Sequence, residues 1–190
     1  ENVKKYKYNG KDDSISAELF LRKYWDYLIT FFPMTIAPNL ITLIGFGVEV
    51  FSFLISFIVS DRMTKQVPGW VCILNGLCLW IYSTLDNLDG RQARRTNSSS
   101  ALGQFFDHGC DAITGVLEMI KVSITFNFGP TSSTFYFAFL MGVGFFMTSW
   151  EEYVTHAFYL GRINGPDDGL LFLSIVQVLA GILPTSFVNA

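Results

Sequence analysis

Charged residues are scarce in this 190-residue chain. Asp, Glu, Lys and Arg make up only 15% of it, whereas a soluble domain carries about 25%. Apolar residues make up 51%, and the net charge of -3 shows no basic excess. So little polar surface cannot solvate a globule, and no basic stripe is present to bind nucleic acid. The sequence therefore predicts a protein that is embedded in a membrane.

Cysteine is also rare. The chain has three cysteines, Cys72, Cys78 and Cys110, and all of them fall in or beside apolar stretches. An odd number without a cluster argues against a disulfide-linked extracellular fold. A removable signal peptide is not expected, because the first residues of the chain are polar.

The apolar residues are gathered in long blocks. A block of roughly 17–25 such residues spans a bilayer as a helix. Four blocks fit this description, and they are residues 38–60, 69–85, 135–154 and 170–188. A fifth candidate, 101–126, is helical in pattern but carries four charged residues. We therefore expect an all-α integral membrane protein, a bundle of five transmembrane helices.

The segment before the first span, 14–32, is predicted to form an amphipathic helix. Its polar residues recur every four positions and form one stripe: Glu18, Arg22, Asp26 and Thr30. This pattern favours a helix in the membrane interface, ended by Pro33. A connector helix packed on the bundle is the alternative. The expected division is an N-terminal cytoplasmic segment, 1–37, and a transmembrane domain, 38–190.

Lys and Arg are distributed unevenly over this topology. If the N-terminus is cytoplasmic, only Arg62 and Lys65 fall on the far side of the membrane. The near side receives Lys4, Lys5, Lys7, Lys11, Arg22, Lys23, Arg91, Arg94, Arg95 and Arg162. Because cytoplasmic loops carry the excess of Lys and Arg, the loop at 95–100 is expected to face the cytoplasm.

Four aspartates flank that loop. Asp86 and Asp89 end one predicted helix, and Asp107 and Asp111 begin the next. At 100° per residue, each pair lies on one arc of its helix. Facing carboxylates repel each other unless a divalent cation lies between them, and oxygen ligands suit Mg²⁺ or Mn²⁺ better than zinc. The alternative is a solvated network in which these acids pair with the neighbouring arginines.

The arc of Asp107 continues along its helix as a polar stripe. Thr114, Glu118 and Lys121 fall within about 40° of it. Ionisable residues at this depth are expected to face the bundle interior. Glu49 lies at a similar depth on the first span, so we predict that Glu49, Glu118 and Lys121 meet in one buried polar pocket.

The pattern Asp-x2-Asp-Gly-x2-Ala-Arg-x8-Gly-x3-Asp-x3-Asp is complete in this chain. It resembles the signature of the CDP-alcohol phosphotransferase family. The segments ARRTNSSS, FDHGCD, APNLITLIGF, WEEY and INGPDDGL are similar to its eukaryotic choline/ethanolamine phosphotransferase branch. Members usually have several more spans, so the chain is expected to be incomplete at its C-terminus.

The resemblance implies an activity and a location. The implied enzyme transfers phosphocholine or phosphoethanolamine from CDP-choline or CDP-ethanolamine to diacylglycerol, and CMP is released. The implied location is the endoplasmic reticulum or a related endomembrane, with the active site facing the cytoplasm and membrane lipids around it. No nucleic acid partner is expected, and a homodimer is left open. Two alternatives keep the fold: CDP-diacylglycerol as the donor, or a family member retained as an accessory subunit.

The resemblance also implies roles for individual residues. Two metal ions, Mg²⁺ or Mn²⁺, would be held over the diphosphate by Asp86, Asp89, Asp107 and Asp111. The implied contacts to the CDP-alcohol are Asn39, Gly90, Ala93, Arg94 and Gly103, with a helix cap as the alternative for Asn39.

The resemblance also implies a general base for the acceptor hydroxyl. The candidates are Asp111 and His108, and histidine titrates nearer neutrality. Glu151 and Glu152 are candidates for further ligands or for contacts to the amino alcohol, whereas Arg91 and Arg95 are expected to be surface charges.

Overall fold

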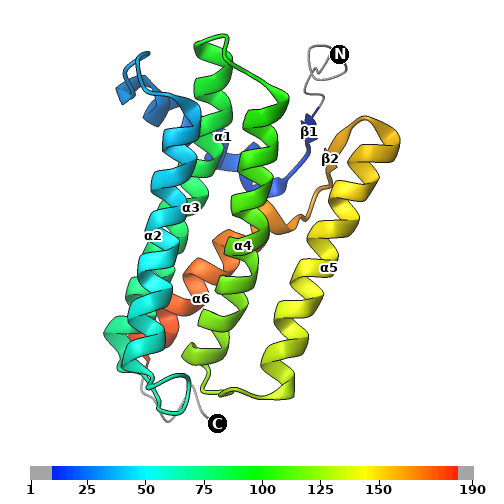
Figure 1. The fold of residues 1–190 in the computed structure, drawn as a ribbon. Coiled ribbons are helices and arrows are strands. Elements are labelled where there is room, and N and C mark those ends of the chain that lie inside the picture. Colours follow the sequence, from blue (N-terminus) through cyan, green and yellow to red (C-terminus); the bar gives the residue numbers. More distant parts are fainter. Residues whose placement is uncertain (1–9, 184–190) are drawn as a thin grey trace.

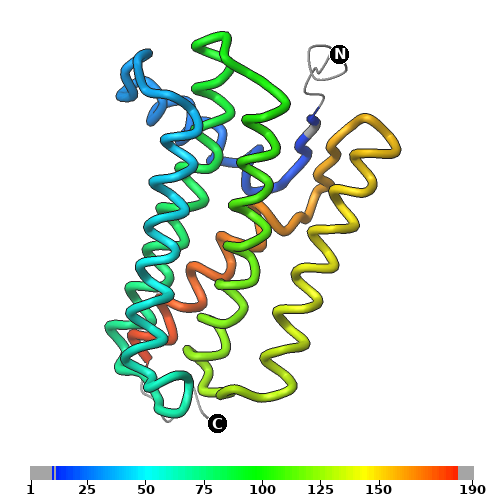
Figure 2. The backbone as a smooth tube through the Cα atoms, in the orientation of Figure 1, coloured from blue at the N-terminus to red at the C-terminus, as the bar shows by residue number. Residues whose placement is uncertain are grey.

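Five long helices account for most of residues 10–183, the part of the chain that the computed structural model describes (Figure 1). They are α2 Pro38–Val59, α3 Gly69–Arg95, α4 Ala101–Thr125, α5 Ser132–Thr155 and α6 Leu170–Ile182. From α2 to α5 each helix reverses the direction of the one before it, and α6 runs back obliquely (Figure 2). The loop between α3 and α4 therefore lies at the opposite end of the bundle from the loop between α2 and α3.

Four helical segments are long and apolar enough to cross a membrane. They are α2, α3, α5 and the segment Gly165–Ile182, which contains α6. The prediction of a helical integral membrane protein is confirmed at this level. Helix α4 has 25 residues but is not among these four segments, so the predicted number of five spans is not confirmed. Residues 184–188 of the last predicted span, and Lys4, Lys5 and Lys7, lie outside the described residues.

Residues with known capping preferences define where the helices begin. Pro38 occupies the first turn of α2, and Pro68 precedes α3. The Ser100 hydroxyl accepts a hydrogen bond from the Gly103 N–H at 3.0 Å and so begins α4. Only five residues separate α3 from α4, so the aspartates on both helices lie at the same end of the bundle.

Helices α3 and α6 pack closely because small residues lie at their crossing. A Cβ atom on Gly76 would lie 2.5 Å from the Ser174 carbonyl oxygen, which leaves no room for a side chain. The Ser174 hydroxyl donates to the Gly76 carbonyl at 2.8 Å. Small residues and interhelical hydrogen bonds of this kind drive helix association in lipid, where no hydrophobic effect acts between helices.

Helix α2 is polar inside and apolar outside. Its buried side chains include one polar residue every turn or two: Thr42, Glu49, Ser52 and Ser56. Its exposed side chains are large and apolar: Leu40, Leu43, Ile44, Phe51, Leu54 and Ile58. This is the reverse of a soluble protein and is the arrangement expected where lipid surrounds the bundle.

The predicted amphipathic helix forms a nearly continuous helical run. A π-helical turn, Ala17–Leu21, leads into α1, Arg22–Leu28, and a 3₁₀ turn, Ile29–Phe31. One apolar stripe is buried against the bundle, and it consists of Ala17, Leu21, Trp25 and Ile29. A second apolar stripe is exposed, and it consists of Leu19, Phe20, Tyr27 and Phe31. Packing on the bundle, the alternative in the sequence analysis, is thus observed, and the exposed stripe is still available to lipid.

Two short strands add to the predicted all-α fold. β1, Gly10–Asp12, pairs in parallel with β2, Phe158–Leu160, next to the end of α5 (Figure 1). The sequence pattern did not predict them, because three residues are too few for an alternation to be recognised. The pairing brings the chain after α5 beside the N-terminal segment.

Candidate metal centre and active site

Three of the predicted aspartates meet at the end of α3 and the start of α4. Asp86 and Asp89 project from α3 and Asp107 from α4, and one carboxylate oxygen of each lies within 4.8 Å of the other two. These three residues form one cluster although 21 positions separate the first from the last. The helix-loop-helix predicted from the sequence therefore brings carboxylates of two helices together.

Hydroxyl groups surround this cluster. The Thr42 hydroxyl on α2 donates to Asp89, and the Tyr82 hydroxyl on α3 donates to Asp111. The Asp111 carboxyl group lies within hydrogen-bonding reach of Asp86, so the fourth predicted ligand belongs to the same site. Thr42 and Tyr82 were not predicted, because a lone hydroxyl in an apolar helix gives no sequence signal.

The cluster leaves carboxylate oxygens without partners. Asp86 Oδ1 and Asp107 Oδ1 are buried, and neither has a hydrogen-bond partner among the described residues. A buried carboxylate is costly unless a charge or donor compensates it. Clustered carboxylate oxygens, two of them without donors, suit a hard divalent cation. The residues present therefore fit a divalent metal ion.

His108 lies at the edge of the cluster, next to Asp107 in the chain. Its Nδ1 is 3.9 Å from Glu152 Oε2, at the end of α5, and its side chain is 22% exposed. Glu152 Oε1 accepts a hydrogen bond from Gln104 Nε2 at 2.6 Å. The imidazole ring packs between Phe145 and Phe158, with centroid distances of 5.9 and 5.6 Å. Glu152 therefore faces the histidine, outside the three-aspartate cluster.

The residues predicted to contact the CDP-alcohol lie around the same end of the bundle. A Cβ atom on Gly103 would lie 3.4 Å from Asn39 Oδ1, so α2 and α4 approach each other there. A Cβ atom on Gly90 would lie 3.6 Å from Arg94 Nη1 on the next turn of α3. Ala93 lies beside Arg94 and is half-buried. Residue 37 caps α2, so the alternative role of Asn39 as the helix cap is wrong.

Two of the arginines bind the N-terminal helical run. Arg91 Nε lies 3.1 Å from Asp26 Oδ1, and its guanidinium lies over the Trp25 ring at 4.9 Å. Arg95 donates to the Ile29 carbonyl oxygen. These contacts weaken the alternative in which the arginines neutralise the four aspartates, and they show that neither residue is simply a surface charge.

A further acidic residue lies nearby and was not predicted. Asp167 is 4% exposed, and its N–H donates to Asn164 Oδ1 at 2.8 Å. Its carboxyl group lies within hydrogen-bonding reach of Asn87, the neighbour of Asp86 on α3. Only the fold brings it there, because more than fifty residues separate it from the aspartate motif.

The predicted polar pocket lies deeper in the bundle, and the structure confirms it. Lys121 forms ion pairs with Glu49 and, at 2.8 Å, with Glu118. Lys121 Nζ also donates to Ser52 Oγ at 3.1 Å, and Gln177 Nε2 donates to Glu118. All five side chains are essentially inaccessible to solvent. We call these five residues the Lys121 network.

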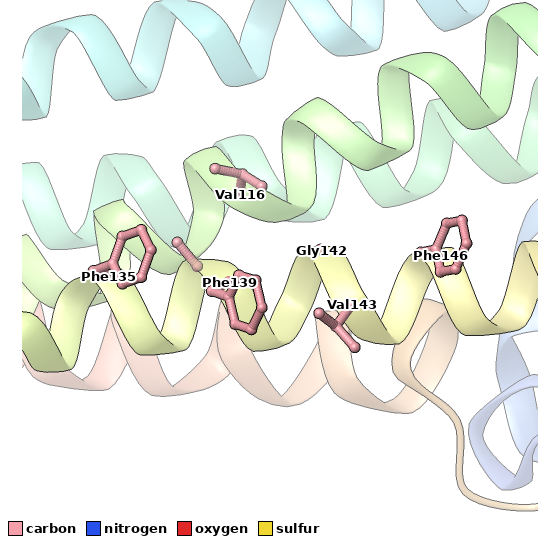
Figure 3. A pocket seen from close by; sticks show the side chains of 7 residues that line it. Val116, Phe135, Phe139, Gly142, Val143 and Phe146 are labelled. Atoms are coloured by element: carbon pink, nitrogen blue, oxygen red, sulfur yellow. The ribbon is translucent and has the colours of Figure 1, made fainter.

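An apolar groove of about 470 Å³ runs between α4 and α5 (Figure 3). It is lined by Val116 of α4 and by Phe135, Ala138, Phe139, Gly142, Val143 and Phe146 of α5. Phe145, beside the last of these residues, contacts the His108 ring. The groove therefore begins near His108 and follows α5 away from the acidic cluster.

Comparison with known proteins supports the assignment suggested by the motif. The family model for CDP-alcohol phosphatidyltransferase matches residues 35–183. A Dictyostelium discoideum protein named uncharacterized CDP-alcohol phosphatidyltransferase class-I family protein 3 is 45% identical over 188 residues, which cover 98% of this chain and 47% of that protein.

Two relatives with functional names match as well. Choline/ethanolaminephosphotransferase 2 of Arabidopsis thaliana is 42% identical, over 90% of this chain and 43% of its own length. Choline/ethanolaminephosphotransferase 1 of Saccharomyces cerevisiae is 36% identical, over 96% of this chain and 46% of its own length. The chain thus spans about half the length of the curated relatives that it matches.

Proposed function

The chain belongs to the CDP-alcohol phosphatidyltransferase family, and we propose that the full-length protein transfers phosphocholine or phosphoethanolamine from a CDP-alcohol to diacylglycerol. The observation that carries this proposal is the gathering of Asp86, Asp89 and Asp107 with unpartnered buried oxygens. The names of the plant and yeast relatives supply the transferred groups, and the family name supplies the CDP-alcohol donor. Diacylglycerol is the acceptor that the resemblance implies. They include proteins named for choline alone and for both alcohols, so either donor is expected.

The metal ligands in this proposal are Asp86, Asp89, Asp107 and Asp111. Two divalent ions, Mg²⁺ or Mn²⁺, fit a site of four carboxylates and a diphosphate substrate. Bound metal would offset the charge of the diphosphate and of the departing CMP. Thr42 and Tyr82 each donate to one of the carboxylates and so fix its orientation.

The acceptor hydroxyl attacks the phosphorus that carries the small alcohol, and the bond from that phosphorus to CMP breaks. We assign the hydroxyl proton to His108. Its Nδ1 faces Glu152, so Nε2 is the nitrogen available as the base. Glu152 is in turn held by Gln104 and acts as a positioning residue. Asp111, which already accepts from Tyr82 beside Asp86, is better placed as a ligand.

The donor nucleotide lies, in this proposal, between the start of α2, the end of α3 and the start of α4. Asn39 contacts it from α2, and Arg94 binds the diphosphate through a charge-assisted contact. Gly90, Ala93 and Gly103 present small side chains there, which allows a bulky group to approach the backbone.

Diacylglycerol is proposed to lie in the groove between α4 and α5. The groove is apolar along its length (Figure 3), and its lining residue Phe146 is the chain neighbour of Phe145, which contacts the His108 ring. Acyl chains in the groove would leave the glycerol hydroxyl at the polar end, next to the proposed base. This arrangement needs no charged group in the groove, and none lines it.

We propose that α4 crosses the membrane together with the four apolar segments, with its charged residues facing the bundle interior. The exposed stripe of the N-terminal helical run lies in the membrane interface. Residues 1–37 then form a cytoplasmic segment, and 38–190 belong to the transmembrane domain. The excess of Lys and Arg at the acidic end favours an active site on the cytoplasmic face of the endoplasmic reticulum.

Reconstitution of the purified full-length protein in diacylglycerol-containing liposomes tests the activity. We expect labelled CDP-choline or CDP-ethanolamine to yield labelled phospholipid with Mg²⁺ or Mn²⁺, and none with a chelator. If CDP-diacylglycerol with a free alcohol as acceptor is the only donor turned over, the alternative donor is favoured. Failure with every donor, in a folded protein, would favour an accessory subunit.

A further inference from the structure

The acidic cluster depends on the position of α4 relative to α3, although these helices touch little. Helix α4 packs mainly on α2 and α5, and α3 packs mainly on α2 and α6. Helix α2 is therefore the support common to both halves of the cluster. What fixes α4 against α2 also fixes Asp107 against Asp86 and Asp89.

Polar contacts of α2 reach both neighbours from one face. Thr42 donates to Asp89 of α3. Seven residues later, two helical turns along the same face, Glu49 pairs with Lys121 of α4, and Ser52 accepts a hydrogen bond from it. Among the described residues, the side-chain hydrogen bonds and ion pairs between α2 and α4 are those of Lys121.

An α-helix is rigid along its axis, so a contact that fixes one residue also fixes the position of residues several turns away. Lys121 lies fourteen residues after Asp107, about 21 Å along the axis of α4 and on nearly the same face. A directional ion pair at that point restricts both sliding and rotation of α4. The carboxylates of the acidic cluster act against this restraint. They repel one another when no cation lies between them, and so push the start of α4 away from α3.

We propose that the Lys121 network is a positioning device for the metal centre, since it holds α4 in the register that keeps Asp107 within reach of Asp86 and Asp89. The inference rests on the proposed function, because it presupposes a metal at the cluster. Stability alone does not require the charges: a buried ion triad replaced by neutral side chains of similar size is often as stable or more stable. A geometric role accounts for their presence in the middle of the bundle.

The test uses the triple variant Glu49→Gln, Glu118→Gln and Lys121→Met in the purified full-length protein. This variant strands no charge, so it is expected to fold with a melting temperature Tm close to that of the wild type. Tm is then measured in detergent against increasing Mn²⁺ without substrate, because a ligand that binds the folded state raises Tm. The Mn²⁺ concentration that gives half the Tm increase is expected to rise about tenfold or more, as for the loss of groups that orient metal ligands.

The matched control is Ser174→Ala. It removes a buried hydrogen bond of 2.8 Å to Gly76 and so loosens α6 from α3 without touching the contacts of α4 to α2. It is expected to lower Tm and to leave the half-saturating Mn²⁺ concentration unchanged.

The outcomes separate the inference from the proposed function. If the triple variant has the same half-saturating Mn²⁺ concentration as the wild type, the inference is overturned and the proposed function is not. An equal loss of Mn²⁺ response in the triple variant and in Ser174→Ala would also overturn it, since the loss would then follow general loosening. A wild type whose Tm ignores Mn²⁺ would overturn the metal centre itself, and the inference with it.

Discussion

Helix α4 contributes to two buried charged clusters that are organised in opposite ways. At its start, Asp107 and Asp111 meet the carboxylates of Asp86 and Asp89. Near its other end, one ammonium lies between two carboxylates, and the hydroxyl of Ser52 accepts a third contact from it. The deeper cluster therefore supplies its own opposite charge. The acidic cluster consists of carboxylates alone, with Asp86 Oδ1 and Asp107 Oδ1 buried and unpartnered, and so fits a bound cation.

This difference makes the two clusters respond differently to the same kind of change. Neutralising a carboxylate in the acidic cluster removes repulsion as well as a proposed metal ligand. Neutralising Lys121 strands two carboxylates in the bundle, whereas neutralising either glutamate leaves Lys121 paired with the other. Substitutions in the acidic cluster are therefore expected to change mainly activity, and substitutions in the Lys121 network mainly stability.

Asp107→Asn is expected to abolish transfer and to leave the Tm of the metal-free protein unchanged or higher. An amide has nearly the size of the carboxylate but is a poor ligand for a hard cation. The measurements are phospholipid synthesis and Tm with a chelator present. Activity above about a tenth of wild type would contradict the role of Asp107 as a ligand.

His108→Ala is expected to lower kcat by about 10²–10⁴-fold with little change in the affinity for the CDP-alcohol. Steady-state kinetics and nucleotide binding measure the two effects separately. The control is His156→Asn at the chain's other histidine, which ends α5 at a φ of 55°, a conformation that Asn tolerates. If only nucleotide affinity fell, His108 would be a binding residue and Asp111 the better base.

Lys121→Met is expected to lower the free energy of unfolding by about 3–5 kcal/mol, because it strands Glu49 and Glu118 together. Glu49→Gln removes one charge, keeps a hydrogen-bonding group and is expected to cost about 1–3 kcal/mol. Denaturation of both variants in detergent gives the comparison. A larger loss for Glu49→Gln would show that Lys121 is not the centre of the network.

Gly142→Phe is expected to raise the KM for diacylglycerol by about three- to tenfold, with the KM for the CDP-alcohol unchanged. A Cβ atom at Gly142 meets nothing within 4 Å, so the ring can fill the groove without a clash. Gly144→Phe is the matched control, since Gly144 has equal space but does not line the groove. Equal effects of the two substitutions would remove the groove from the acceptor path.

The helical architecture and the acidic motif could be predicted from the sequence because both are local. Long apolar blocks form helices in lipid whatever their neighbours, and a spacing of three or four residues puts Asp86 with Asp89, and Asp107 with Asp111, on one arc. The pocket at Glu49 and Lys121 was predictable for a similar reason. The depth of a residue in the membrane follows from its position along the helix, and a buried ammonium group is expected to pair with a carboxylate.

The contacts that depend on side chains from distant segments could not be predicted. Glu152 faces His108 only because α5 packs on α4, and Asp167 reaches Asn87 only because the chain returns beside α3. The β1–β2 pairing joins segments about 150 residues apart. Hydrophobic periodicity in the sequence carries no information about contacts between such distant segments.

The sequence by itself thus determined where the apolar helices lie, that Asp107, Thr114, Glu118 and Lys121 share one face of their helix, and that four carboxylates lie at one end of the bundle. Only the tertiary structure decided that α2 is the support shared by α3 and α4, and that Thr42 and Tyr82 orient the carboxylates. The physical reason is the range of the interactions. Helix geometry fixes positions over a few residues, whereas the approach of two helices depends on which small and polar residues happen to meet across the whole chain.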